Sequence, residues 1–358
     1  MHFSSKLLFI SLIICTISCL NANGPDGAEY QFTWQSQTSN ITASIRGIDV
    51  IDDSSAWISG TGGQYAITKD AGANWMPAVV TGADSLDFRD IAAFSNGTTY
   101  LLSAGPGEKS RVYKSTDGGK NWQLQFTSPF PNGFFSAMAF WDDKSGIAFS
   151  DPVDGRFAII STTDGGENWR QLAPEQMPPA IDGEYAFAAS GTCLIAGDGG
   201  NAWIASGGAA ARVFHSPDYG KSWSVFDTAM RSGTPSAGIF SIAFKDANNG
   251  IAVGGDYQNP EVAENNVART TDGGKTWQLL ANPAELAYRS CVRYLEKGDL
   301  SILIAVGRSG CSYSTDDGLT WHDFGNEVYY TFDISPSGNS IWAAGSDGRV
   351  AKLKIDHL

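Results

Sequence analysis

The sequence predicts an all-β protein in which seven four-stranded sheets close into a ring. Three observations support this fold class. One eight-residue pattern occurs six times in the 358 residues, successive copies lie 44 to 54 residues apart, and a strand pattern near the N-terminus can complete the last sheet. A repeat of about 40 to 50 residues is typical of one blade of a β-propeller. We therefore predict a single seven-bladed β-propeller.

Each copy of the pattern has the form Ser/Thr-x-Asp-x-Gly-x-x-Trp. The hydroxyl and the carboxylate can accept backbone N–H groups in a tight turn, and Gly allows the positive φ that reverses the chain. We expect the Trp side chain to pack beneath the turn. The aspartates and tryptophans of the six copies are Asp70 and Trp75, Asp117 and Trp122, Asp164 and Trp169, Asp218 and Trp223, Asp272 and Trp277, and Asp316 and Trp321.

The strands of the first six blades are expected between these turns. Residues 45–50, 56–60 and 64–68 precede the first turn and form the first three strands of blade 1. The inner strands of the following blades are expected to begin near Phe88, Phe135, Tyr185, Ile239 and Tyr288.

The seventh blade needs a strand from the other end of the chain. Residues 329–335, 341–345 and 349–355 supply only three strand patterns. The segment 30–35 alternates apolar and polar residues, as a half-buried strand does, and is predicted to add the fourth. Closure of the ring would remove unpaired sheet edges. A six-bladed ring is the alternative, but it would leave about 30 patterned residues without a place.

The repeated octad resembles the Asp-box, or bacterial neuraminidase repeat, of sialidases, sortilin-type receptors and other propellers. Nearly the whole chain is similar to propellers of the photosystem II stability and assembly factor type. The resemblance implies that the six boxes are structural, not catalytic, and that they lie on the face opposite the ligand site. It leaves the function open, because Asp-boxes occur in proteins with different activities.

The N-terminus has the pattern of an export signal. Leu7 to Leu20 form an apolar run of about 14 residues after Lys6, whereas a membrane-spanning helix needs about 20. We therefore expect residues 1–22 to be a signal peptide, residues 23–358 to be the propeller, and no transmembrane span. Thr16-Ile-Ser-Cys19 resembles a bacterial lipobox, so Cys19 is a candidate for lipidation, and ordinary cleavage near Ala22 is the alternative. The protein is then expected in the periplasm or as an outer-membrane lipoprotein, or else secreted.

Charge and cysteine content exclude several classes of partner. The chain has 24 Lys+Arg against 38 Asp+Glu and a formal net charge of -14, which disfavours binding to nucleic acid or to anionic membranes. Cys193, Cys291 and Cys311 lack the spacing of a zinc site, and we expect no metal and no cofactor. We expect these thiols to be buried, and a Cys291–Cys311 disulfide is the one pairing that could form. The protein is expected to be a monomer.

Candidate ligand-binding residues come from the face opposite the boxes. In a blade, the start of the inner strand and the end of the second strand emerge on that face. Alignment of the inner strands places Arg46, Arg89, Arg289 and Tyr330 on the consecutive blades 1, 2, 6 and 7. The ends of the second strands add the following four residues: Arg308 on blade 6, and Asp151, Asp198 and Asp256 on blades 3, 4 and 5. These positions predict a basic half and an acidic half of one face.

A cluster of guanidinium groups is suited to binding a carboxylate or a phosphate. The alternative is that these charged side chains form salt bridges that order the loops. We expect a noncatalytic, exported propeller that binds a protein partner, or an anionic or glycan ligand, as an assembly or scaffold factor in the cell envelope. A sialidase-like glycoside hydrolase is the alternative function, although Phe88-Arg-Asp-Ile91 does not match the Phe/Tyr-Arg-Ile-Pro sequence of that family.

Overall fold

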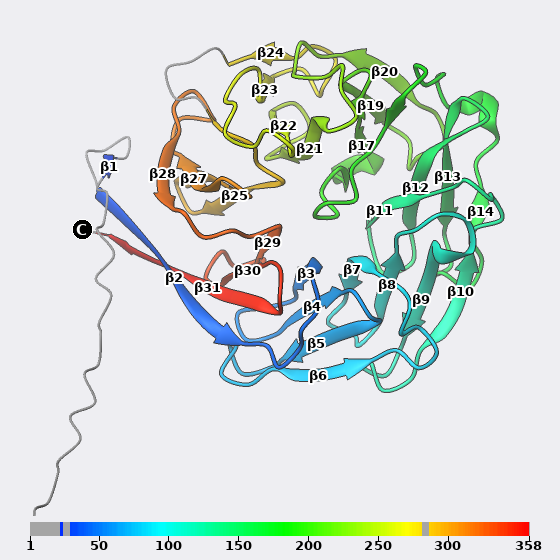
Figure 1. The fold of residues 1–358 in the computed structure, drawn as a ribbon, viewed down its shortest axis with the longest axis horizontal. Coiled ribbons are helices and arrows are strands. Elements are labelled where there is room, and N and C mark those ends of the chain that lie inside the picture. The colour runs from blue at the N-terminus through cyan, green and yellow to red at the C-terminus, as the bar shows by residue number, and fades with distance from the viewer. Residues whose placement is uncertain (1–21, 24–28, 281–285, 358) are drawn as a thin grey trace, which may run out of the picture.

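The computed structural model describes residues 22–23, 29–280 and 286–357. Its strands form seven antiparallel sheets around one axis, as Figure 1 shows. Each sheet is a blade whose successive strands run outwards from the axis. The predicted seven-bladed β-propeller is therefore confirmed, and the six-bladed alternative is wrong.

Blades 1 to 3 follow the chain in order, from the inner to the outer strand. Blade 1 contains β3 (Ile45–Val50), β4 (Ala56–Gly60), β5 (Gln64–Thr68) and β6 (Met76–Val79). Blade 2 contains β7 (Phe88–Ala93), β8 (Thr99–Ser103), β9 (Arg111–Ser115) and β10 (Gln123–Thr127). Blade 3 contains β11 (Phe135–Phe140), β12 (Gly146–Val153), β13 (Arg156–Thr162) and β14 (Arg170–Gln171).

Blades 4 to 6 repeat the same order. Blade 4 contains β16 (Leu194–Ala196), β17 (Ala202–Ala205), β19 (Arg212–Ser216) and β20 (Ser224–Asp227). Blade 5 contains β21 (Ala237–Phe244), β22 (Gly250–Asp256), β23 (Val267–Thr270) and β24 (Gln278–Leu279). Blade 6 contains β25 (Cys291–Lys297), β26 (Leu300–Gly307), β27 (Gly310–Ser314) and β28 (His322–Gly325).

Blade 7 closes the ring with strands from both ends of the chain. It contains β29 (Thr331–Ile334), β30 (Ile341–Ala344) and β31 (Arg349–His357), followed by β2 (Glu29–Thr38) and the short β1 (Ala22–Asn23). In Figure 1, β2 runs beside β31, and their pairing extends from Tyr30 opposite His357 to Thr38 opposite Arg349. This pairing confirms closure by the N-terminal strand.

The six Asp-boxes have the hydrogen bonds that the sequence predicts. In the first box, the Thr68 hydroxyl accepts the N–H of Gly72 at 2.9 Å, and the Asp70 carboxylate accepts the N–H of Asn74 at 2.8 Å. The other five boxes repeat both bonds at 2.8–2.9 Å. The boxes are therefore turns that satisfy their own backbone donors.

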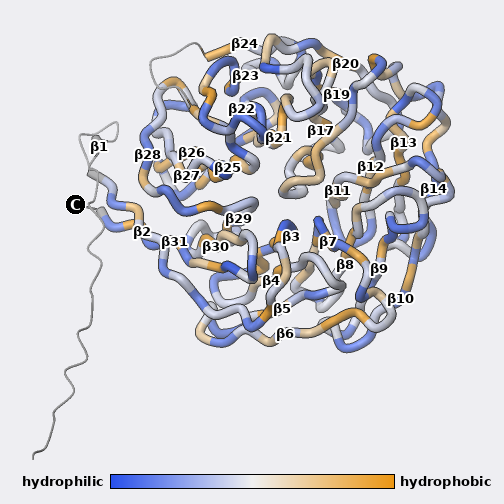
Figure 2. The backbone as a smooth tube through the Cα atoms, viewed as in Figure 1, coloured by the Kyte–Doolittle hydropathy of each residue, from blue (hydrophilic) through white to orange (hydrophobic). Residues whose placement is uncertain are grey.

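The apolar core lies between the blades. Figure 2 shows that hydrophobic residues recur within every blade instead of gathering at one centre. Between blades 2 and 3, for example, Tyr100 and Leu102 pack with Phe135 and Ala148, and all four side chains are almost fully buried. Each blade thus completes the core of its neighbour, which is why an open ring would expose apolar surface.

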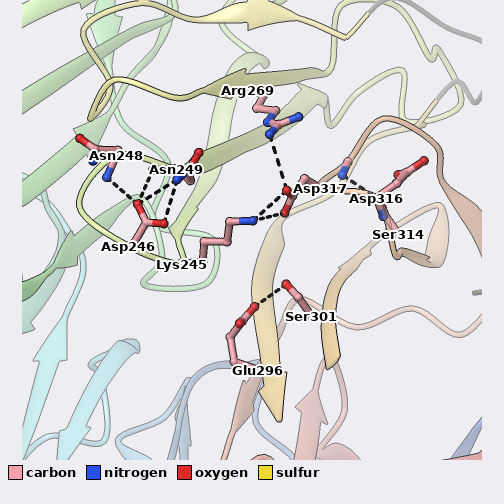
Figure 3. A network of polar contacts seen from close by, with 11 residues as sticks. Lys245, Asp246, Asn248, Asn249, Arg269, Glu296, Ser301, Ser314, Asp316 and Asp317 are labelled. Atoms are coloured by element: carbon pink, nitrogen blue, oxygen red, sulfur yellow. Dashed lines mark hydrogen bonds and ion pairs between the residues drawn. The ribbon is translucent and has the colours of Figure 1, made fainter. Parts of the chain in front are cut away.

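Polar contacts also join neighbouring blades. Figure 3 shows Lys245, which follows the inner strand of blade 5, bound to Asp317 in the Asp-box turn of blade 6 at 2.6 Å. Arg269 in β23 approaches the same carboxylate at 3.5 Å. Asp317 therefore receives two cations from the preceding blade, at a position where three of the other five boxes have Gly.

One predicted strand is wrong. The inner strand of blade 4 is β16, not a strand beginning near Tyr185. Tyr185 belongs to β15 (Glu184–Tyr185), which pairs with β18 (Gly207–Gly208) and so extends the sheet of blade 5. The physical cause is Glu184, whose buried carboxylate pairs with Arg212 at 3.0 Å and fixes the chain away from the inner-strand position.

Residues 186–192, here called the crossing segment, then run over the axis before β16 begins. From blade 4 they reach across to the other side of the ring, since Arg46 of blade 1 bonds the carbonyl of Ala189 and the Ser190 hydroxyl bonds the carbonyl of Ser290 beside blade 6. Gly191 adopts a φ of 78°, and a Cβ there would meet the Asp90 carboxylate at 2.3 Å. Glycine is thus required where the segment passes blade 2.

The cysteines Cys193, Cys291 and Cys311 are free and buried, so the Cys291–Cys311 disulfide does not form. Cys19 and the predicted signal segment up to residue 21 lie outside the described residues. Within the described ranges, no helix has the length and apolar character needed to cross a membrane.

Candidate functional site

A cavity of about 570 Å³ opens at the axis of the ring. It lies on the face opposite the Asp-boxes: Ile45 at the start of β3 pairs with Gly60 at the end of β4, while Thr68, where the first box begins, pairs with Ala56 at the other end of the sheet. The cavity draws residues from six blades and from the crossing segment. Its lining includes five predicted site residues, namely Arg46, Arg89, Asp151, Arg308 and Tyr330.

Bulges in the inner strands turn Arg46 and Arg89 toward this cavity. In blade 1, Ile45 pairs with Gly60 and Gly47 with Ser59, which leaves Arg46 as the extra residue. In blade 2 the same shift between Phe88 and Asp90 leaves Arg89 unpaired. A bulge redirects the side chain of the extra residue, so both guanidinium groups are aimed by the backbone.

Arg46 is held by an aromatic ring and a backbone carbonyl. Its guanidinium lies 4.4 Å from the centre of the Tyr330 ring, and Nη1 donates to the carbonyl of Ala189 at 3.3 Å. Burial and the nearby charge of Arg89 lower the pKa of Arg46 from its ordinary value. Two positive charges are thus kept close together, and a bound anion would reduce the repulsion between them.

Arg89 has a carboxylate partner, whereas Arg308 has none among the described residues. The Nε of Arg89 bonds Asp87 at 2.7 Å, and its Nη1 reaches the carbonyl of Ala188 at 3.4 Å. Arg308 is exposed and donates to the carbonyl of Tyr257 at 3.4 Å. Among the described residues, no carboxylate lies within 4.0 Å of the guanidinium nitrogens of Arg46 or Arg308.

The other side of the cavity is an aromatic wall. Phe187 of the crossing segment stacks on Phe240 of β21 with ring centres 3.8 Å apart and planes 11° apart. Tyr257 presents its edge to both rings at 6.3 Å, and Tyr288 meets Phe240 edge-on at 4.8 Å. The cavity therefore combines a cationic side with an apolar one.

Asp151 is the one acid among the described residues that line the cavity. Its Oδ1 accepts the N–H of Ala186 at 2.9 Å, and burial raises the pKa of Asp151 to about 7. The usual glycosidase mechanism needs two carboxyl groups that flank the bond to be cleaved. The lining offers one.

Arg289 does not reach the cavity, contrary to the sequence alignment. It is 1% exposed and donates to Ser312 at 2.6 Å and to Asp323 at 3.2 Å. The reason is that Arg289 precedes β25 and is not the extra residue of a bulge, so its side chain runs into the blade. It corresponds to the alternative interpretation, a structural ion pair.

Asp198 and Asp256 also lie away from the cavity. Asp198 begins the short 3₁₀ helix η3 (Asp198–Gly200) between β16 and β17, on the Asp-box face, because blade 4 starts later than predicted. Asp256 ends β22 as expected, but it is 2% exposed and accepts bonds from Gln258 and Asn259 within its own turn. The predicted acidic half of the face therefore reduces to Asp151.

Sequence reasoning missed the aromatic wall. Phe240 occupies the bulge position of blade 5 that Arg46 and Arg89 occupy in blades 1 and 2, so the alignment itself contained that signal. Phe187 gave no signal, since it enters the cavity only through the crossing segment. Tyr257 and Tyr288 lie in loops, where strand patterns say nothing about direction.

Seven four-stranded blades, six Asp-box turns and an axial cavity on the opposite face define an Asp-box β-propeller, and this chain is one. The family described as BNR/Asp-box repeat matches residues 113–124 and 268–279. No curated protein gives a significant match to the sequence.

Solved propellers match nearly the whole chain. The structure titled "YCF48 bound to D1 peptide" is 18% identical, with 96% of this chain and 99% of that chain covered and a TM-score of 0.62. YCF48 from Cyanidioschyzon merolae is also 18% identical, with 89% and 98% covered and a TM-score of 0.64. The Pan2 WD40 domain from Neurospora crassa is 12% identical, with 90% and 94% covered and a TM-score of 0.62.

At such identities the likeness is one of fold. It confirms the predicted resemblance to propellers of the photosystem II stability and assembly factor type. Function depends on the residues of a particular site, and those have to be considered on their own chemistry.

Proposed function

We propose that this chain is an exported, noncatalytic propeller that binds a protein partner through the axial cavity and acts as an assembly or scaffold factor in the cell envelope. The observation behind this proposal is that Arg46 and Arg308 face one cavity and that, among the described residues, neither has a carboxylate partner. Guanidinium groups in that state are suited to a carboxylate from another molecule.

The solved relatives support protein binding. One YCF48 structure holds a D1 peptide, and WD40 propellers are among the similar folds. Export rests on the apolar run from Leu7 to Leu20. Lipidation of Cys19 would place the propeller at a membrane surface, whereas cleavage near Ala22 would release it.

Affinity capture from the native envelope tests this function. We expect the wild-type protein to retain a specific protein and the triple variant Arg46→Ala, Arg89→Ala, Arg308→Ala to lose it while remaining folded by circular dichroism. Arg170→Ala is the matched control, because Arg170 is an exposed arginine on the outer strand of blade 3. Equal capture by the triple variant would contradict the proposal.

The hydrolase alternative is tested with fluorogenic sialosides. We expect no turnover, since a single acid lines the cavity among the described residues. Turnover that Tyr330→Phe abolishes would replace the binding function with a sialidase-like one.

A further inference from the structure

A second hollow continues the axial cavity outwards. It has a volume of about 510 Å³ and shares Tyr257, Arg308 and Tyr330 with the axial cavity. Its remaining lining is Gln258, Pro260 and Val328. Because three residues border both hollows, they form one trough that runs from the axis toward blades 5, 6 and 7. An elongated ligand can therefore occupy both parts.

The crossing segment closes the bottom of this trough. The Ser190 hydroxyl bonds the carbonyl of Ser290 at 2.7 Å, the Thr331 hydroxyl bonds the carbonyl of Ser190 at 3.3 Å, and Thr192 bonds Ser241 at 2.6 Å. These contacts tie the segment to blades 5, 6 and 7. A ligand chain cannot thread through the ring here, so it must lie along the face and insert side chains.

The aromatic residues of the trough are arranged to receive such a side chain. Phe187 and Phe240 are buried and fixed by stacking, whereas Tyr257 and Tyr330 are half-buried and keep ring surface open. Rings that already pack against one another lose little freedom when a ligand binds. An aromatic group favours offset or edge contacts with such rings.

The arginines supply the second element of recognition. The face of Arg46 is covered by Tyr330, and among the described residues its one hydrogen-bond acceptor is the Ala189 carbonyl. In the same part of the chain, Arg308 has only the Tyr257 carbonyl. A guanidinium has five N–H donors in one plane. Most donors of both groups are therefore available to a ligand in that plane. A carboxylate can accept two parallel hydrogen bonds from the N–H groups of one guanidinium.

We propose that the trough recognises an extended peptide segment in which an aromatic residue is flanked by acidic residues. The aromatic side chain packs against Tyr257, whose ring meets the stacked pair Phe187 and Phe240 edge-on, and the flanking carboxylates pair with Arg308 and Arg46. This specificity rests on the proposed protein-binding function and adds to it the class of segment that is bound.

Three synthetic heptapeptides test the proposal. Each carries an N-terminal fluorescein and a C-terminal amide, with Phe between two Glu, Phe between two Gln, or Ala between two Glu at the centre. Fluorescence anisotropy with the full chain measures Kd. We expect the Glu-Phe-Glu peptide to bind about tenfold more tightly than either of the others, since each loses one of the two contacts.

Variants assign the two contacts to residues. Arg308→Gln is expected to reduce the advantage of Glu over Gln, because only the Arg46 contact remains, and Tyr257→Leu is expected to reduce the advantage of Phe over Ala. Arg170→Gln is the unchanged control. Thermal melts identify any variant that fails to fold. The comparison of the three peptides on the wild-type protein tests the proposal even if a variant fails to fold.

Equal binding of the Phe and Ala peptides would overturn the proposal, as would binding of none of them. Binding of 3′-sialyllactose in place of the peptides would overturn it in favour of an acidic glycan. If the peptides fail while envelope capture still depends on the three arginines, only the inferred specificity is wrong. If capture does not depend on them, the proposed function is wrong as well.

Discussion

The hydroxyl of Tyr100 in blade 2 donates a 2.6 Å hydrogen bond to the carbonyl of Gly165 in the Asp-box turn of blade 3. The same kind of bond joins Tyr65 to Gly119 at 2.7 Å and Trp203 to Gly273 at 2.9 Å. An aromatic donor of one blade therefore holds the box of the next. This explains how an exposed turn can be structural: it is a point of attachment between blades.

Replacing Tyr100 by Phe is expected to lower stability by about 0.5–1.5 kcal/mol, because the ring stays and only the hydrogen bond is lost. Tyr100 is fully buried, so solvent cannot replace the donor easily. Urea unfolding measures the change. Tyr219→Phe, at a side chain that is 47% exposed, is the control. An unchanged midpoint in Tyr100→Phe would mean that the bond does not hold the blades together.

Gln37 of β2 links the closing strand to two tryptophans. Its Oε1 accepts the indole N–H groups of Trp75 in the first box and of Trp342 in β30, each at 3.0 Å. In Gln37→Leu both N–H groups lose their acceptor. We expect the free energy of unfolding to fall by about 1–3 kcal/mol for each unsatisfied N–H group. Gln35→Leu changes an exposed residue of the same strand and should have little effect. A similar melting temperature for the two variants would show that the Gln37 hydrogen bonds do not stabilise the closed ring.

The Glu184–Arg212 pair is expected to anchor the crossing segment. Both residues are buried, at 3% and 8% exposure, so Glu184→Ala leaves a buried cation and should cost about 3–5 kcal/mol. The double variant Glu184→Leu, Arg212→Met removes both charges and should recover much of that loss. Chemical denaturation of the single and double variants measures it. A double variant as unstable as the single one would refute the explanation.

Asp151 should make the protein less stable at alkaline pH. Burial raises its pKa to about 7, so the folded state holds a proton that the unfolded state releases near pH 4. Its contribution to stability is therefore complete below about pH 4 and is lost as pH rises through about 7. Asp151→Asn keeps an acceptor for the Ala186 N–H and should gain a few kcal/mol over wild type at pH 8.

The measurement is the unfolding midpoint between pH 5 and pH 9. Asp90, whose pKa burial also raises to about 7, has the same sign and remains in both proteins. The difference between the two pH profiles therefore isolates Asp151. Parallel profiles would show that Asp151 titrates normally.

Arg289 separates structure from binding. Because it is buried against Ser312 and Asp323, Arg289→Ala should lower stability by about 2 kcal/mol or more. Capture of the partner should survive in the folded fraction, unlike in the Arg46, Arg89, Arg308 triple variant. If the Arg289→Ala variant kept its full stability but no longer captured the partner, Arg289 would have to be part of the binding site.

The repeated boxes determined the fold class, because each box carries its own hydrogen-bond donors and acceptors within eight residues. The alternation in residues 30–35 likewise determined the closing strand, since a period of two already specifies a half-buried strand. These features are local, and local features can be recognised in a sequence. The face of the ring that holds Arg46 and Arg89 followed from the alternation of strand direction.

Only the tertiary structure decided which predicted side chains share a site. Bulges turn Arg46 and Arg89 into the cavity, while Arg289 has no bulge and points into its blade. The strand expected at Tyr185 is displaced because Glu184 pairs with Arg212, 28 residues away, and this displacement brings Phe187 to the axis and puts Asp198 on the other face. The residue pattern of a strand predicts that the strand will pair, but it does not specify its partner or its register. The partner and the register depend on contacts that form only when the ring is closed.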